Sequence, residues 1–82
     1  MAGHTQPLLN RIVVSREVCH GKPRIEGTRV MVHHILGLLA AGKSIEQITS
    51  EEYYPDITTE DVLACLAYAS RLVENDTVVP TA

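Results

Sequence analysis

The chain has 82 residues, 45% of them hydrophobic, and contains no Trp and no Phe. A chain this short buries only about 60–65% of its unfolded surface, which excludes a second core. The net charge of −3 argues against a protein that binds nucleic acid through its overall charge.

Charge is divided unevenly along the sequence. Residues 1–43 contain six basic side chains and two acids, whereas residues 44–82 contain eight acids and one basic side chain, Arg71. The two halves therefore carry +4 and −7. A polyanion would meet the first half.

The first ten residues, MAGHTQPLLN, show no periodicity and lack the basic and apolar regions of a signal peptide. We expect them to form a flexible arm. The longest apolar run, residues 35–42, is far shorter than the roughly 20 residues that span a bilayer. The prediction is a soluble, cytoplasmic protein with no membrane contact. In that setting Cys19 and Cys65 are expected to be free thiols.

A strand and a corner follow the arm. Residues 11–15 (RIVVS) are short and β-branched, which predicts a strand. Gly21-Lys22-Pro23 and Glu26-Gly27-Thr28 are turn sequences, because Gly supplies positive φ and Pro fixes φ at about −65°. Residues 24–25 and 29–30 are compatible with extended segments beside these turns.

An amphipathic helix is predicted over residues 31–41, because apolar residues recur there at i, i+3, i+4 and i+7. Gly42 is a natural C-cap for this helix. The expected core stripe consists of Val32, Ile35, Leu36 and Leu39.

A short helix is predicted next, with Ser44 as its N-cap and Gln47 completing a capping box. It is expected to continue through about Glu52, with Ile45 and Ile48 facing inward. Tyr53-Tyr54-Pro55-Asp56 then breaks the helical pattern.

The longest predicted helix starts at Thr58 or Thr59 and ends near Asn75, with Glu60 and Asp61 in its first turn, where the helix dipole favours acids. Its expected core face consists of Val62, Leu66, Ala69 and Val73, joined by Leu63, Cys65 and Leu72.

These elements predict one domain at residues 11–75, between the arm at 1–10 and a tail at 76–82. A strand, turns and three helices with a short middle helix are the layout of a helix-turn-helix domain. The simpler alternative is a small helical bundle, which sequence spacing alone does not separate from it.

Metal binding and catalysis are weakly supported by the histidines and cysteines. Cys19, His20, His33 and His34 show neither C-x-x-C nor H-x-x-x-H spacing, which argues against zinc. Neighbours such as Cys19 and His20 rarely form a nucleophile and base pair. A buried, structural Cys19 is the favoured interpretation, and we expect no catalytic, metal or cofactor site.

Nucleic-acid binding has two possible routes. The corner lacks a G-x-x-x-x-G-K-[ST] pattern, yet Lys22, Arg24 and Arg29 are compatible with contacts to a nucleic-acid backbone. Reading of DNA by the third helix is disfavoured, because phosphates would repel Glu60 and Asp61 at its entering end.

Protein binding is favoured by surplus apolar residues. The helix at 31–41 is apolar nearly all round, and the third helix adds Ala64, Ala67 and Tyr68. A domain of this size does not bury all of them. We expect a homodimer in which the short strands also pair across subunits.

Several separated motifs follow one another along the chain. They are Cys19-His20-Gly21-Lys22-Pro23, Gly27-Thr28-Arg29, Leu39-Ala40-Ala41-Gly42, Tyr54-Pro55 with Thr58, and the run Ala64 to Ala69. In this order they resemble a known bacterial family, the domain of unknown function 433 family, grouped with VapB-type antitoxins. The resemblance covers residues 11–72, about three quarters of the chain.

The resemblance implies a homeodomain-like three-helix fold and a cytosolic antitoxin, often encoded beside a PIN-like nuclease that it neutralises. It implies no catalytic residue. Met31 departs from the proline expected at the start of the first long helix. The residues expected to shape the corner are Cys19, Gly21, Pro23, Gly27 and Thr28.

Two partner surfaces are hypothesised from this resemblance and from the charge distribution. An acidic surface would bind the basic, RNA-binding face of a PIN-type nuclease, and its residues are Glu51, Glu52, Asp56, Glu60 and Asp61. A basic surface would contact DNA phosphates in a homodimer that acts as a transcriptional regulator, and its residues are Arg11, Lys22, Arg24 and Arg29.

Overall fold

A computed structural model describes residues 6–75, so the expectations for residues 1–5 and for the tail at 76–82 lie outside the described residues. Its elements in chain order are α1 (Gln6–Leu9), β1 (Ile12–Val13), the 3-10 helix η2 (Cys19–Gly21), β2 (Arg24–Ile25), α2 (Val32–Ala40), α3 (Ile45–Ile48) and α4 (Thr59–Asn75). This part of the chain is compact and largely helical, with three helices following a two-stranded antiparallel sheet. The coarse fold class predicted from the sequence is confirmed.

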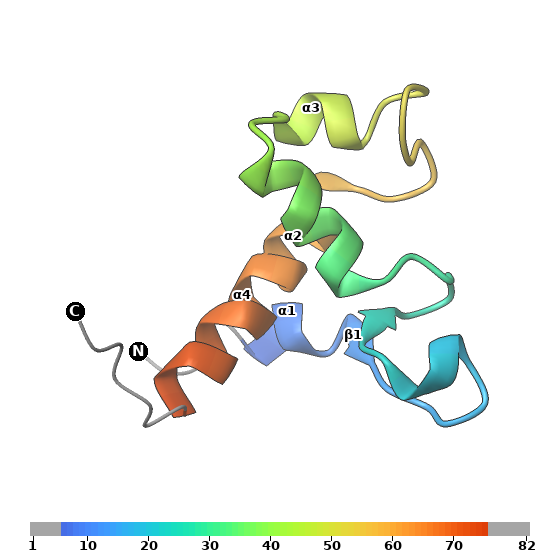
Figure 1. The fold of residues 1–82 in the computed structure, drawn as a ribbon, viewed down its shortest axis with the longest axis vertical. Helices are drawn as coiled ribbons and strands as arrows, with labels where there is room; N and C mark the ends of the chain where they lie inside the picture. Colours follow the sequence, from blue (N-terminus) through green and yellow to red (C-terminus); the bar gives the residue numbers. More distant parts are fainter. Residues whose placement is uncertain (1–5, 76–82) are drawn as a thin grey trace.

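Part of the expected N-terminal arm is ordered. Residues 6–9 form α1, which lies against α4 (Figure 1). Leu8 and Leu9 are half-buried, and the N–H of Arg11 donates to the carbonyl of Leu8 at 3.0 Å. The packed part of the chain therefore extends N-terminal to residue 11.

The two strands form an antiparallel pair in which Ile12 faces Ile25 and Val13 faces Arg24. A single bridge between Arg24 and Met31 extends the pairing on the other side of β2. The predicted strand at 11–15 and the extended segment at 24–25 are both confirmed, and this small sheet positions the corner between them.

α2 ends where the glycine predicts. Gly42 has φ of 91°, and the N–H groups of Gly42 and Lys43 donate to the carbonyls of Leu39 and Leu38, both at 3.0 Å. These two bonds form a Schellman motif, which satisfies carbonyls left free at the helix end. At the other end Met31 takes the N-cap position.

α3 has the predicted capping box. The side chain of Ser44 accepts from the N–H of Gln47 at 3.1 Å, and the side chain of Gln47 accepts from the N–H of Ser44 at 3.0 Å. The helix ends at Ile48, so the predicted end near residue 52 is wrong. Hydroxyl groups explain the early end, because Thr49 and Ser50 donate to carbonyls of the preceding turn.

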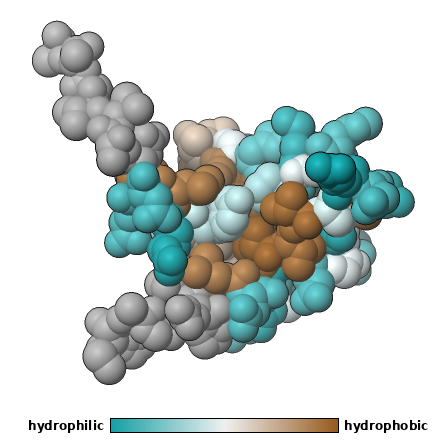
Figure 2. All heavy atoms as spheres, turned by 90° about the horizontal axis from the view of Figure 1, so that it is seen from below, coloured by the Kyte–Doolittle hydropathy of each residue, from teal (hydrophilic) through white to brown (hydrophobic). Residues whose placement is uncertain are grey.

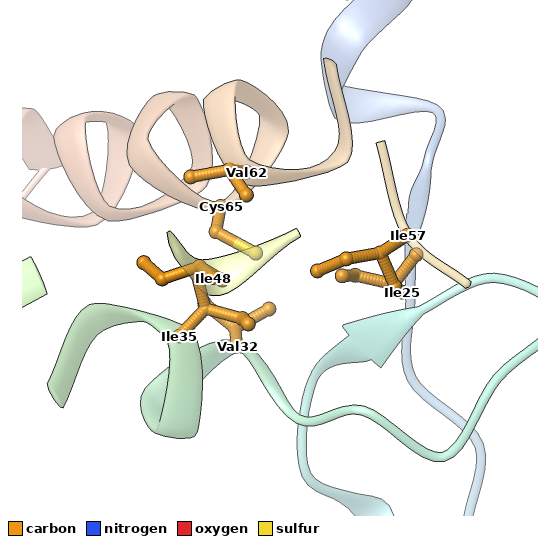
Figure 3. Close-up of a cluster of buried hydrophobic side chains, with 7 residues drawn as sticks. All are labelled: Ile25, Val32, Ile35, Ile48, Ile57, Val62 and Cys65. Atoms are coloured by element: carbon orange, nitrogen blue, oxygen red, sulfur yellow. The ribbon is translucent and has the colours of Figure 1, made fainter. Parts of the chain in front are cut away.

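The core is aliphatic, as the composition predicts, and its buried members come from β2, α2, α3, α4 and the connection before α4 (Figure 3). They are Ile25, Val32, Ile35, Ile48, Ile57, Val62 and Cys65. The side chain of Cys65 points from α4 toward the group formed by Val32, Ile35 and Ile48, while Ile25 and Ile57 lie together beside this group. Leu36, Leu39 and Ile45 pack against the cluster as partly buried neighbours.

The buried face of α4 differs from the predicted one. Leu66 and Val73, expected in the core, are 41% and 73% exposed, whereas Ala64 and Ala67 are buried. Small side chains permit a close approach of neighbouring elements to a helix, which is consistent with alanine at these two buried positions. Asp61, expected at the surface, is also buried.

Candidate functional site

The corner between the strands has a left-handed backbone. Cys19, His20 and Gly21 have φ of 54°, 56° and 78°, and for a residue other than glycine this conformation costs roughly 1–2 kcal/mol. Hydrogen bonds hold it in place, since the N–H of Lys22 donates to the carbonyl of Cys19 at 3.0 Å. The thiol of Cys19 also donates to the carbonyl of Arg29 at 3.7 Å.

Thr28 closes the second turn, which precedes α2. Its hydroxyl donates to the carbonyl of Ile25 at 2.8 Å and accepts from the N–H of Val30 at 3.0 Å. Gly27 has φ of 81°, and the carbonyl of Pro23 accepts from the N–H of Val32 at 3.0 Å. The turn residues therefore make contacts that shape the corner.

Arg24 uses its guanidinium inside this corner. One terminal nitrogen donates to the carbonyl of Thr28 at 3.1 Å, and the other donates to the hydroxyl of Ser15 at 3.4 Å. Its Nε is buried and has no hydrogen-bond partner among the described residues. Arg24 is therefore much less accessible to a phosphate than its sequence position suggests.

Arg11 joins the segment before β1 to the start of α4. Its guanidinium lies 3.0 Å from the Asp61 carboxylate and 3.8 Å from the Glu60 carboxylate. One predicted cation and two predicted acids are thus brought together within the chain. The structure places them in a single internal cluster, whereas the sequence assigns them to separate partner surfaces.

Asp61 also caps α4. Its second carboxylate oxygen accepts from the N–H of Thr58 at 2.9 Å, and the Thr58 hydroxyl accepts from the N–H of Asp61 at 3.2 Å. Both Asp61 oxygens are therefore engaged within the chain. The Glu60 side chain remains 65% exposed.

The three other predicted acids lie on the connection between α3 and α4. Glu51, Glu52 and Asp56 are all exposed. Ser50 orders the start of this connection, because its hydroxyl donates to the carbonyl of Gln47 at 2.6 Å and accepts from the N–H of Glu52 at 3.2 Å. The acids therefore extend into solvent from a locally hydrogen-bonded backbone.

Two depressions meet at the tyrosines of this connection. A cavity of about 640 Å³ lies between the turn at 27–30 and residues 53–57, with Arg29 and Asp56 among its lining residues. A second, of about 430 Å³, is lined by Tyr53 and Tyr54 together with His33 and His34 of α2. In the sequence this tyrosine pair is predicted to break the helical pattern, and two adjacent aromatics in a polar loop are also a signal for a contact surface.

The histidines do not assemble a metal site in the part of the chain that the structure describes. His33 and His34 stack edge to face, with ring centroids 4.3 Å apart, and both are exposed. Within residues 6–75 no group of three or more His, Cys, Asp or Glu side chains is arranged to hold a metal ion.

Cys65 is chemically suppressed by its position. It is fully buried on the core side of α4. Burial has the larger effect and the nearby Asp61 charge the smaller one, and together they raise the pKa of its thiol from 9.0 to about 11. A protonated, inaccessible thiol is neither a nucleophile nor a metal ligand at neutral pH. Cys65 is therefore a core residue.

Apolar side chains also gather at the surface. Figure 2 looks at the molecule from the side on which α1 and the last turns of α4 lie, and it shows hydrophobic atoms in the centre with hydrophilic residues around them. A depression of about 280 Å³ in this region is lined by Leu9, Ile12, Tyr68 and Leu72 with Arg71 and Asn75. None of the helices in the described residues has both the length and the apolar character to traverse a bilayer.

Comparison with known proteins gives one match. No curated protein and no solved structure matches the chain. The family model described as "Protein of unknown function (DUF433)" matches residues 12–69, which include both strands, η2, α2, α3 and most of α4. Because this match covers well over half of the sequence, the chain belongs to the DUF433 family.

Proposed function

We propose that the protein is a non-catalytic, cytoplasmic antitoxin that neutralises a PIN-like nuclease by direct protein binding. The observation that carries the proposal is an asymmetry between the two predicted surfaces. Arg11 and Arg24 are engaged within the chain, whereas Glu51, Glu52 and Asp56 are exposed on one connection. The acidic surface is thus available to a partner, and half of the basic surface is not.

The chemistry of this acidic surface suits a nuclease. An RNA-cleaving partner needs a positively charged surface, and carboxylates facing it give the complementary potential that speeds association and selects the partner. Tyr53 and Tyr54 lie among the acids, and tyrosines are enriched in protein interfaces. We therefore define the acidic loop as Glu51, Glu52 and Asp56. We leave out Asp61 because both of its oxygens are engaged, and Glu60 because it lies in α4, 3.8 Å from Arg11.

The helix-turn-helix interpretation is part of the same proposal. α2 and α3 are separated by residues 41–44, a connection of the length typical of this motif, with Gly42 at positive φ. Residues 49–58 separate α3 from α4 by a longer stretch. A helix-turn-helix motif in this chain would therefore consist of α2 and α3. The single-turn α3, and not α4, would be the helix that contacts the DNA bases.

The test is a calorimetric titration with the PIN-like nuclease that the proposal expects to be encoded beside this gene. The variant carries Glu51→Lys, Glu52→Lys and Asp56→Lys. A matched control carries the same charge change at exposed sites elsewhere, through Glu17→Lys, Glu26→Lys and Glu46→Lys. We expect the loop variant to bind at least about 100-fold more weakly than the control. Equal affinities of the two variants would exclude the acidic loop as the contact.

A second candidate is a homodimeric DNA-binding regulator. Lys22 and Arg29 support it, because both remain exposed on the corner. The exposed edge residue Val14, 56% accessible, favours strand pairing between two copies. DNA affinity that falls steeply with salt, and falls further in Lys22→Ala with Arg29→Ala, would establish this role. Unchanged affinity in that variant would remove it.

A further inference from the structure

α4 is apolar on the face that points away from the core as well as on the buried face. Leu63, Leu66 and Val73 are 38%, 41% and 73% exposed, whereas Asp61 and Ala64 on the opposite side of the helix are buried. A surface helix normally presents charged and polar residues to water. The outward face of this helix is therefore suited to a contact.

The exposed residues follow the spacing of a helix-packing seam. Leu63, Leu66, Ser70 and Val73 are separated by three, four and three residues, which aligns them along one side of the 17-residue helix. Ser70 is small and exposed, so that a partner side chain fits above it. We call these four residues the outer seam.

Carboxylates flank the outer seam. Glu60 precedes Leu63 by one turn, and its side chain is 65% exposed although it lies 3.8 Å from Arg11. Glu74 follows Ser70 by one turn and is exposed. The only basic residue of α4, Arg71, lines the depression beside Leu9 and Ile12. The edge of the seam therefore has a negative potential.

We propose that the outer seam docks a cationic amphipathic helix of a partner protein, with aliphatic residues against the seam and Lys or Arg beside Glu60 and Glu74. A second copy fits less well, because an antiparallel pairing of two α4 helices would bring Glu60 of one close to Glu74 of the other. The inference rests on the proposed function only in that the partner is a protein. The seam and the acidic loop are separate surfaces.

The experiment uses two designed helical peptides and fluorescence anisotropy with the full chain. Both peptides carry leucines at the seam spacing, and they differ only in having lysines or glutamates at the flanking positions. We expect the lysine peptide to bind at least about 10-fold more tightly than the glutamate peptide. Equal binding of the two peptides, or no binding of the lysine peptide, would overturn the proposal.

Two variants locate the binding face. Leu66→Gln removes a leucine of the seam, and Leu72→Gln removes a comparably exposed leucine, 55% accessible, from another side of the same helix. We expect Leu66→Gln to weaken binding of the lysine peptide about 10-fold or more, and Leu72→Gln to change it less than about 2-fold. Equal losses in both variants would show nonspecific binding to apolar surface and contradict the assignment.

Charge and self-association give two further readouts. The pair Glu60→Gln with Glu74→Gln is expected to remove the preference for the lysine peptide, whereas Glu17→Gln with Glu26→Gln keeps it. If sedimentation shows a dimer that Leu66→Gln converts to a monomer, a second copy occupies the seam and the proposal fails. These peptide results are independent of the nuclease titration, so either proposal can fail while the other stands.

Discussion

Arg11 and Asp61, fifty positions apart in the sequence, form an ion pair with a nitrogen to oxygen distance of 3.0 Å. The pair holds the segment before β1 against the first turn of α4. The Asp61 side chain is only 12% exposed, and its two oxygens accept hydrogen bonds from Arg11 and from the Thr58 N–H.

Arg11→Ala is expected to lower the free energy of unfolding by about 1–2 kcal/mol, less than for a fully buried pair because Arg11 is 42% exposed. The matched control is Arg16→Ala, at an exposed arginine of the corner, which should change the value by less than about 0.5 kcal/mol. Urea denaturation measures both. Similar losses in the two variants would contradict the internal role of Arg11.

The cap of α4 gives a second prediction. Thr58→Ala removes the hydroxyl that accepts from the N–H of Asp61, and it should destabilise the protein by about 1 kcal/mol. Thr59→Ala, one residue later at the exposed first position of the helix, should be nearly neutral or slightly stabilising. The same denaturation experiment distinguishes them, and a greater loss at Thr59 would mean that the helix starts one residue later.

Two glycines are expected to respond to alanine with opposite signs. Gly27 has φ of 81° and open space around it, so Gly27→Ala should cost about 1 kcal/mol through backbone strain alone. Gly37 lies inside α2 with equally open space, so Gly37→Ala should stabilise the protein by about 0.5–1 kcal/mol. A pair of melting curves tests this contrast, and a loss of stability at Gly37 would show that something closely covers that face of α2.

Cys65 is expected to make the free energy of unfolding depend on pH. Its pKa is raised from 9.0 to about 11 in the folded chain, so that above pH 9 the unfolded state releases the proton and the folded state retains it. Stability from this group is full below pH 9 and falls by about 1.4 kcal/mol per pH unit until about pH 11.

The difference between wild type and Cys65→Ala isolates this contribution, because every other side chain is the same in both proteins. We expect the variant to lose less stability than wild type between pH 8 and pH 10.5. Parallel loss in the two proteins would mean that the thiol is not perturbed by burial.

Local signals in the sequence account for most of the fold. The Ser44 capping box and the Gly42 helix end depend on contacts within a few residues, and each is found where the pattern predicts it. The two strands lie within the predicted segments, although their pairing joins residues on either side of the corner. The predicted end of α3 is wrong because the hydroxyls of Thr49 and Ser50 compete for backbone carbonyls. The spacing of apolar residues carries no information about these hydrogen bonds.

Tertiary contacts explain the remaining differences. Leu66 and Val73 are predicted to be in the core because they are more hydrophobic than alanine. In the structure they are exposed, and Ala64 and Ala67 are buried instead. The charges of Arg11 and Asp61 indicate two surfaces when read separately. Only the fold shows that they neutralise one another. The spacing of apolar residues at 63, 66 and 73 is the signal in the sequence for the outer seam, because it defines a second apolar stripe on the helix.

The proposed antitoxin role is tested most directly by titrating this protein into an RNA-cleavage assay of the PIN-like nuclease that the proposal expects to be encoded beside it. We predict complete inhibition at an equimolar ratio, lost in the Glu51, Glu52 and Asp56 charge-reversal variant and retained in the matched control. Undiminished RNA cleavage at a large excess of the wild-type protein would contradict the antitoxin role.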